Sequence, residues 1–530
     1  MSITHHLSFT RVAVATLLAT TLTAGISGCS SSDSATPVTT IDGSVFASSV
    51  NGASCGIYTG PDAMVGSLFT TDESGTFSVT IPKSKLAGDL VLYCEGGTYT
   101  DEVTGTTETA GIMAAFATAG TLSDGAGLNA TPGSTIVFQL ISDYDMTPAE
   151  AEAAFELAFG YVPDVTAMPT DATNPASGSS LAAIEAGLRA AAFAQLTWDN
   201  ELSANQQFDF LTALAEDLSD GVQNGMSVGG GNVTIGVAGP TLSTVDFAGA
   251  MDSFRTRTAL TSSYKISYNS MMMDQHGKDQ FRINITDLGG VPVTGLTVSA
   301  MPMMYMETKT HSTPVEGCSE IDSGNYDCTV YYVMASKMGD GSSMGEWDLK
   351  VMVGGMMGEA VHFYPKVMMA MGDTPVVMLR NSNLTMTMND VTSARTFQIF
   401  KSELTRIAAS NHTFELFTST METMMSFPAV DNSATLNAGT MNELPISGMT
   451  VEVSITPTFD VVYDASEDGN GYWSATGIAG LADDAAVSLY VRVTINGHIL
   501  NSSPDGVAGD GINNYGTFNV TTPSGIVILM

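Results

Sequence analysis

The sequence is poor in basic residues. It holds 18 lysines and arginines against 55 aspartates and glutamates, so its formal net charge is −37. Nucleic-acid binding needs clustered Lys and Arg, so this balance argues against nucleic acid as a partner and against attraction to anionic lipid head groups. Charged residues make up only 14% of the chain and hydrophobic ones 44%, which disfavours a highly charged disordered chain and favours a β-rich globular protein.

Catalytic and metal-binding signatures are also scarce. The seven histidines are few and scattered, and no GxSxG, HExxH, P-loop or dinucleotide fingerprint occurs. We therefore predict that the protein is not an enzyme. The five cysteines form no CxxC or CxxCH pattern, so zinc ribbons and covalent haem lack their usual sequence support.

The amino terminus reads as an export signal over residues 1–29. A basic residue precedes an apolar run over residues 12–22, which is too short to span a bilayer stably. The stretch ISGC, which ends at Cys29, resembles a bacterial lipobox. The resemblance implies cleavage before Cys29, lipidation of its sulfur and, because serine follows it, a place at the outer membrane. Whether the protein faces the periplasm or the exterior stays open.

The other four cysteines lie in two local pairs. Cys55 and Cys94 fall in one early region, and Cys318 and Cys328 fall in one later region. In an exported chain such pairs indicate disulfides, here assigned from neighbourhood alone.

Pattern changes divide the rest of the chain into a tether and four domains. Residues 30–40 are a short polar tether. Residues 41–125 alternate apolar and polar side chains, as antiparallel strands do, and residues 126–260 carry helical spacing. Residues 261–380 and 381–530 return to strand patterns. The predicted fold class is mainly β and multidomain, with immunoglobulin-like β-sandwiches and one inserted α-helical bundle.

One stretch of the sequence carries a complete set of signals for the start of a helix. The stretch TPAEAEAAFELAFGY offers a capping Thr147, then Pro148 at the first helical position, then acidic residues in the first turn. We expect a helix to begin at Pro148.

Two segments resemble known β-modules. The pieces IDGSV, TTDESGTFSV and LYCEGGTY resemble carboxypeptidase-regulatory-like β-sandwiches, which serve mostly as scaffolds. Gly277 to Val353, with GKDQFRINITDLGGVPVTGLTVSAMPMM and GEWDLKVMV, resembles the FixH-like/YtkA-like immunoglobulin-type domains of bacterial envelope proteins. This second resemblance implies a sandwich fold, with copper handling or respiratory-complex assembly in some relatives and a purely structural role in many.

The second segment is also rich in methionine. Between Met271 and Met388 lie 19 of the 32 methionines, together with three histidines. Thioether and imidazole are a suitable ligand set for Cu(I). The candidate ligands form three groups: Met271, Met272 and Met273 with His276; Met301, Met303, Met304 and Met306 with His311; and Met356 and Met357 with His362.

Packing is the competing interpretation of the same residues. In a strand, Met301 and Met303 point to one face and Met304 and Met306 to the other. One face of a sandwich is core, so at least one of these pairs is expected to act as flexible filler. We predict a lipid-anchored cell-envelope binding protein with copper as its cofactor, the membrane as one partner and an envelope protein as another. The alternative is a structural or adhesive surface lipoprotein without metal, whose methionines pack the core.

Overall fold

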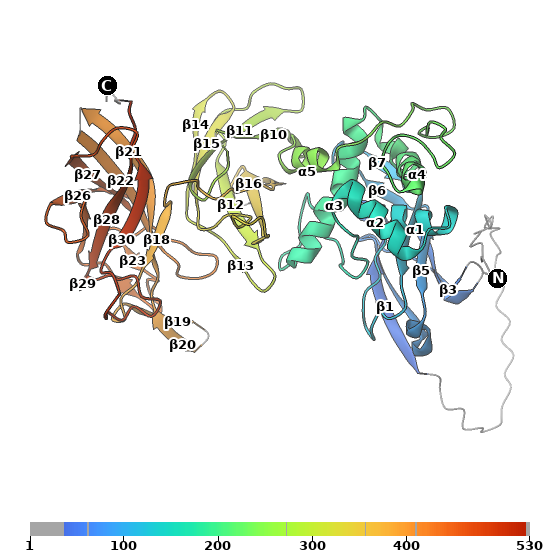
Figure 1. Ribbon diagram of the computed structural model, residues 1–530, viewed down its shortest axis with the longest axis horizontal. Helices are drawn as coiled ribbons and strands as arrows, with labels where there is room; N and C mark the ends of the chain where they lie inside the picture. Colours follow the sequence, from blue (N-terminus) through green and yellow to red (C-terminus); the bar gives the residue numbers. More distant parts are fainter. Residues whose placement is uncertain are drawn as a thin grey trace. The chain divides into compact units, whose positions relative to one another are not determined.

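The computed structural model describes residues 37–60, 63–271, 273–355, 357–388, 390–408 and 411–525. It confirms the predicted mainly β, multidomain class. The chain forms two compact units, unit 1 up to Arg257 and unit 2 from Thr258 onward (Figure 1). The division into four domains within them stays a prediction. Cys29 and the rest of the expected export signal lie outside the described residues. Within the described ranges, no helix has the length and apolarity needed to cross a membrane.

Unit 1 begins with three small antiparallel sheets. Strand β1 pairs with β4, β6 pairs with β7, and the third sheet has the order β3-β2-β5-β8. Alternate side chains of β1 are buried, and they share one apolar core with the third sheet. The strands are β1 (Val38–Ser44), β2 (Ser54–Tyr58), β3 (Met64–Thr70), β4 (Thr76–Pro82), β5 (Leu90–Glu95), β6 (Thr98–Thr100), β7 (Thr107–Thr109) and β8 (Ile112–Ala117).

Helices then pack against this β-structure. Ser134 of α1 donates from Oγ to the carbonyl oxygen of Ala114 in β8 at 2.7 Å. Phe208 of α4 packs against both the helical core and the β core, so the two are continuous. The helices are α1 (Pro132–Asp143), α2 (Pro148–Phe159), α3 (Leu181–Asp199), α4 (Gln207–Asp217) and α5 (Phe247–Arg255), with short 3₁₀ turns η1 (Lys83–Ala87), η2 (Ala204–Gln206) and η3 (Leu218–Asp220).

Helix α2 begins where the sequence predicts. The Glu150 carboxylate accepts a hydrogen bond from the Thr147 backbone N–H at 2.9 Å, and Thr147 Oγ1 accepts from the Glu150 N–H at 3.3 Å. This capping box satisfies two backbone donors that the first turn leaves unpaired. Gly160, with φ of 76°, ends the helix in the left-handed conformation that glycine adopts most easily.

Unit 2 begins with a two-sheet sandwich. A five-stranded sheet of order β14-β15-β11-β10-β9 and a four-stranded sheet of order β13-β12-β16-β17 share one apolar core. The strands are β9 (Ala259–Leu260), β10 (Tyr264–Ser270), β11 (Gly277–Asp287), β12 (Val298–Tyr305), β13 (Thr310–His311), β14 (Val315–Asp322), β15 (Asn325–Tyr332), β16 (Glu346–Val353) and β17 (Glu359–Phe363). We call this part the Met-rich sandwich.

The rest of unit 2 is built on one large antiparallel sheet. Its strand order is β18-β21-β22-β27-β26-β25-β28-β29, and β30 also pairs with β28. Side chains from β22, β25, β28 and β30 share a single core, so the two ends of this sheet enclose the same apolar interior. The strands are β18 (Val376–Leu379), β19 (Thr385–Met388), β20 (Val391–Ala394), β21 (Phe397–Ala408), β22 (Asn411–Thr420), β23 (Thr435–Leu436), β24 (Leu444–Pro445), β25 (Met449–Ser454), β26 (Val462–Gly469), β27 (Tyr472–Ala479), β28 (Ala486–Ile495), β29 (His498–Ile499) and β30 (Gly516–Thr521).

The two β-structures of unit 2 touch through a small aromatic joint. The Tyr331 ring stacks on Phe417 with centroids 4.2 Å apart, and its hydroxyl lies 2.5 Å from that of Tyr472. Beside this joint, the Ser312 backbone N–H donates to the carbonyl oxygen of Met424 at 2.7 Å. The loop that carries Met424 is therefore fixed next to the end of β13.

Both predicted disulfides are present. Cys55 and Cys94 lie directly opposite each other on β2 and β5, and Cys318 and Cys328 lie opposite each other on β14 and β15. The bridges close sequence separations of 39 and 10 residues.

Replacing Cys55 and Cys94 together with alanine is expected to lower the free energy of unfolding of unit 1 by about 4 kcal/mol, against about 3 kcal/mol in unit 2 for Cys318 and Cys328. The longer loop gives the larger effect because its closure removes more entropy from the unfolded chain. Urea unfolding followed by circular dichroism measures both losses. A larger loss from the shorter loop would contradict this entropic account.

Candidate functional site

The first predicted ligand group is not assembled. Met271 and Met273 are exposed, and Met272 lies outside the described residues. His276 is half-buried, and its Nε2 lies 3.0 Å from the carbonyl oxygen of Val333. The hydrogen-bond partner of this nitrogen in the described part of the chain is thus a backbone carbonyl and not a thioether.

The third group is spread along one hairpin. Met357 is 98% exposed, and Met356 lies outside the described residues. His362 is buried on β17, where its Nδ1 lies 2.8 and 3.0 Å from the two carboxylate oxygens of Asp348. A carboxylate thus orients this imidazole.

The second group is partly brought together. Along β12 the side chains alternate as predicted: Met304 is 0% exposed in the core, Met301 is exposed on the other face and Met303 is half-buried there. Met306, just beyond the strand, packs at the core edge. A tight turn, in which the Met306 N–H donates to the Lys309 carbonyl at 3.0 Å, leads back into β13.

Strand register places an imidazole, a thioether and an indole in one row. Met304 lies directly opposite His311 of β13 on one side and Trp347 of β16 on the other. Directly opposite residues of antiparallel strands share a face. The rings of His311 and Trp347 are 5.6 Å apart, edge to face. Gly345 lets β16 approach, because a Cβ there would lie 2.2 Å from the Tyr305 carbonyl oxygen.

Sequence reasoning missed the closest sulfur. Met334, in the segment after β15, places its Sδ 3.2 Å from Nε2 of His311. The Trp347 indole N–H donates to the Met334 carbonyl oxygen at 3.1 Å, which fixes the backbone of this residue. Met334 and His311 are 23 residues apart, and only the fold brings them together.

The proton positions on His311 follow from its partners. Its Nδ1 lies 2.8 Å from the carbonyl oxygen of Ser312, which can only accept, so Nδ1 carries the proton. Burial lowers the pKa of His311, and Lys309 lowers it further, so the ring is neutral. The second nitrogen, Nε2, therefore presents a bare lone pair to the thioether of Met334, which also has no proton to donate.

Three other methionines belong to the same core as Met334. Met306, Met334 and Met344 are half-buried and pack against the core beside the buried Met304. We call these four residues and His311 the thioether end of the sandwich. In the described part of the chain, no three His, Cys, Asp or Glu side chains gather as a metal-binding group.

Comparisons with known proteins give no family. No protein-family model and no curated protein matches the chain. Among solved structures it is similar to the Yersinia pseudotuberculosis adhesin InvE, with 13% identity and a TM-score of 0.15 over 49% of this chain and 60% of that one. It is also similar to invasin, a bacterial integrin-binding protein, with 8% identity and a TM-score of 0.15 over 87% of this chain and 57% of that one. A third similar structure is an endo-fucoidan hydrolase of glycoside hydrolase family 107, with 13% identity and a TM-score of 0.14 over 54% of this chain and 42% of that one. The chain thus spans about three fifths of the first two structures, and TM-scores this low carry no argument about its function.

Proposed function

We propose that the protein is a non-enzymatic, lipid-anchored protein of the bacterial envelope that binds Cu(I) at the thioether end of the Met-rich sandwich. The contact between Nε2 of His311 and Sδ of Met334 carries the proposal. Two lone pairs that face each other without a proton repel, and a soft cation bound by both removes that repulsion. Imidazole and thioether are ligands that suit Cu(I).

The distance between the two atoms fits a shared metal. Nε2 of His311 and Sδ of Met334 lie 3.2 Å apart, which is close enough for both atoms to serve as ligands of one ion. Met304, which lies opposite His311 in register, and the half-buried Met306 and Met344 are the residues that would supply the remaining ligands. None of these ligands is charged, so the monovalent ion would enter the site without losing a proton from the protein.

Contacts that hold His311 and Met334 in place support the same role. The Ser312 carbonyl holds the His311 tautomer, and the Trp347 indole holds the Met334 backbone. Outer contacts that orient ligands in this way are typical of metal sites. The indole ring beside His311 also offers a π-face that attracts cations.

A competition titration tests this function. The full-length protein, purified in detergent with both disulfides intact, is titrated with Cu(I) kept reduced by ascorbate against a chromophoric chelator. We expect one equivalent bound more tightly than micromolar. If the chelator retains all the copper, the proposal fails.

The alternative candidate is a structural or adhesive surface lipoprotein without metal. Its supporting observation is that Met304 is fully buried in the core, while Met273, Met301 and Met357 lie exposed on separate segments. This is the distribution expected if methionine serves as filler and surface residue. The failed titration described above is the result that this alternative requires.

The membrane anchor is a separate part of the proposal and rests on the lipobox resemblance at Cys29. Replacing Cys29 with alanine is expected to move the protein from the membrane fraction to the soluble fraction and to remove the lipid mass from its amino-terminal peptide. A Ser30→Ala variant is the control and keeps both. Membrane retention of the Cys29→Ala variant would refute lipid anchoring through this residue.

A further inference from the structure

A cluster of largely buried aspartate and tyrosine side chains lies on the five-stranded sheet of the Met-rich sandwich, whereas His311 and Met304 of the thioether end belong to the four-stranded sheet. Asp279 belongs to β11 and stands in the core-facing phase of that strand, where it is 3% exposed. Tyr332 belongs to the adjacent β15 and is 0% exposed. Asp274, in the segment before β11, and Tyr268 of β10 complete the cluster.

Register brings the strand members together. Tyr332 lies directly opposite Gly277, and Asp279 is the next residue of β11 on the same face. Such diagonal neighbours are about 7–8 Å apart at Cα, within reach of an aromatic side chain. Gly277 adds no side chain between them, so Tyr332 and Asp279 are neighbours on the core face of the sheet, near enough for the Asp279 carboxylate to raise the pKa of the Tyr332 phenol.

Hydrogen bonds satisfy only part of the cluster. Asp274 accepts from the Ser270 side chain, and Asp279 accepts from the backbone N–H groups of Gln275 and Gln280. The Tyr268 hydroxyl donates to Oδ1 of Asp274 at 2.5 Å. In contrast, Oδ2 of Asp279 and the hydroxyl of Tyr332 are buried and make no hydrogen bond to any described residue. Buried polar atoms nearly always have partners, so two such atoms on neighbouring side chains indicate a missing group.

The cluster is also short of positive charge. Within the described ranges, neither Asp274 nor Asp279 forms an ion pair with a Lys, Arg or His side chain. Burial, and then the neighbouring Asp274, raise the pKa of Asp279 to about 8, and burial raises the pKa of Asp274 as well. Burial and both carboxylates raise the pKa of the Tyr332 phenol. A buried carboxylate beside a half-buried one, with no partner charge, is unfavourable, and a bound cation compensates both.

We propose that Asp274 and Asp279, with the hydroxyl of Tyr332, form a calcium site. Its ligands differ from those of the thioether end, but the two lie close together, because the Tyr332 ring packs on Trp347 with centroids 4.8 Å apart and Trp347 packs on His311. Carboxylate and hydroxyl oxygens are ligands for hard cations, whereas the thioethers select soft ones. Calcium accepts irregular coordination completed by water, while magnesium demands near-octahedral geometry. Asp274 is half-buried, so the site is reached from the segment that precedes β11.

The affinity is expected to be modest. Only two ligands carry charge, and modules outside the cell with few charged ligands bind calcium with dissociation constants of about 0.1–1 mM. At 10 mM calcium, mass action then raises the melting temperature of unit 2 by about 3–6 °C.

Thermal unfolding of the full-length protein at pH 8.5 tests the site. Melting temperatures are measured in chelator, in 10 mM CaCl₂ and in 10 mM MgCl₂ at matched ionic strength. The parent is expected to gain stability in calcium and less in magnesium. The Asp279→Asn variant loses the calcium gain, Tyr332→Phe reduces it, and Asp510→Asn, which removes an exposed carboxylate of unit 2, keeps it.

The melting temperature of Asp279→Asn in chelator shows whether this variant folds. Asp279→Asn removes a buried charge, so without metal it is expected to be at least as stable as the parent, which shows that it folds. An equal calcium gain in parent and Asp279→Asn would overturn the site, because the gain then comes from surface charges. No gain in the parent would also overturn it, because the carboxylate is then compensated by a proton. Cu(I) affinity is expected to be unchanged in Asp279→Asn, so this site and the thioether end are tested independently.

Discussion

Replacing Met334 with leucine is expected to weaken Cu(I) binding about 100-fold or more while the protein stays folded. The variant removes the sulfur that lies 3.2 Å from His311 and keeps the volume of the side chain. Loss of a metal ligand is more damaging than loss of an outer contact, which already weakens metal sites about 10–100-fold. Exchange of methionine for leucine usually changes the free energy of unfolding by less than about 1.5 kcal/mol. Chelator competition measures the affinity, and urea unfolding measures the stability.

A matched control separates a site from general methionine content. Met338 lies four positions further along the same segment and is exposed, so Met338→Leu makes the same chemical change away from His311. We expect its Cu(I) affinity to equal that of the parent. Equal weakening by both variants, or by neither, would contradict a site at the thioether end.

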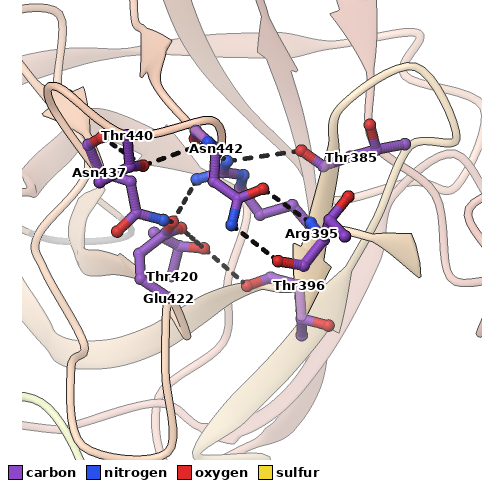
Figure 2. A network of polar contacts seen from close by, with 9 residues as sticks. Thr385, Arg395, Thr396, Thr420, Glu422, Asn437, Thr440 and Asn442 are labelled. Atoms are coloured by element: carbon purple, nitrogen blue, oxygen red, sulfur yellow. Dashed lines mark hydrogen bonds and ion pairs between the residues drawn. The ribbon is translucent and has the colours of Figure 1, made fainter. Parts of the chain in front are cut away.

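Replacing Glu422 with glutamine is expected to lower the free energy of unfolding of unit 2 by about 3 kcal/mol. Glu422 forms a fully buried ion pair with Arg395, and the Thr420 hydroxyl donates to its other oxygen at 3.0 Å (Figure 2). Arg395 also donates to the Asn442 carbonyl oxygen at 2.7 Å. Removal of one partner leaves a buried charge uncompensated, which typically costs about 3–5 kcal/mol. Urea unfolding of unit 2 measures the loss.

Two further variants test whether the loss comes from the buried, unpaired charge. Asp327→Asn breaks the partly exposed pair with Arg282 and is expected to cost less than about 1 kcal/mol. Joint replacement of Arg395 with methionine and Glu422 with leucine removes both charges and is expected to recover most of the stability. The prediction fails if Glu422→Gln and Asp327→Asn have equal effects.

The ion pair between Arg395 and Glu422 is connected to the thioether end through the loop that contains Met424. The Glu422 backbone N–H donates to the Ser426 carbonyl at 2.9 Å and so closes the short loop that contains Met424. The carbonyl of Met424 in turn accepts from the N–H of Ser312, whose own carbonyl holds the His311 tautomer. The buried pair therefore supports, through one loop, the segment that orients the imidazole.

The parts of the fold that the sequence predicts are those set by local interactions. The cap at Thr147 and the alternation of Met301 and Met304 depend only on neighbouring residues and on the geometry of one element. Neighbourhood in the chain alone predicts both disulfides, and the structure confirms them, with the cysteines opposite each other on paired strands.

The parts that sequence reasoning missed depend on register between distant strands. Met334 reaches His311 because the end of β15 lies beside the segment after β13, where the Val333 N–H donates to Thr313 Oγ1 and the Tyr331 N–H donates to the Pro314 carbonyl oxygen. Nothing local in the sequence marks it. Asp279 did carry a signal, since it occupies the apolar phase of β11 with Phe281 and Ile283. An acidic residue in that phase predicts a buried carboxylate. Arg395 had no such signal, because its partner Glu422 comes from another segment.

The copper X-ray absorption spectrum of the Cu(I)-loaded full-length protein shows directly whether thioethers bind the metal. A site at the thioether end predicts one nitrogen scatterer at about 2.0 Å and two or three sulfur scatterers at about 2.3 Å. A first shell with only nitrogen and oxygen would show that the copper is bound elsewhere. The methionines around His311 would then be packing, and the account of a copper-binding sandwich would be wrong.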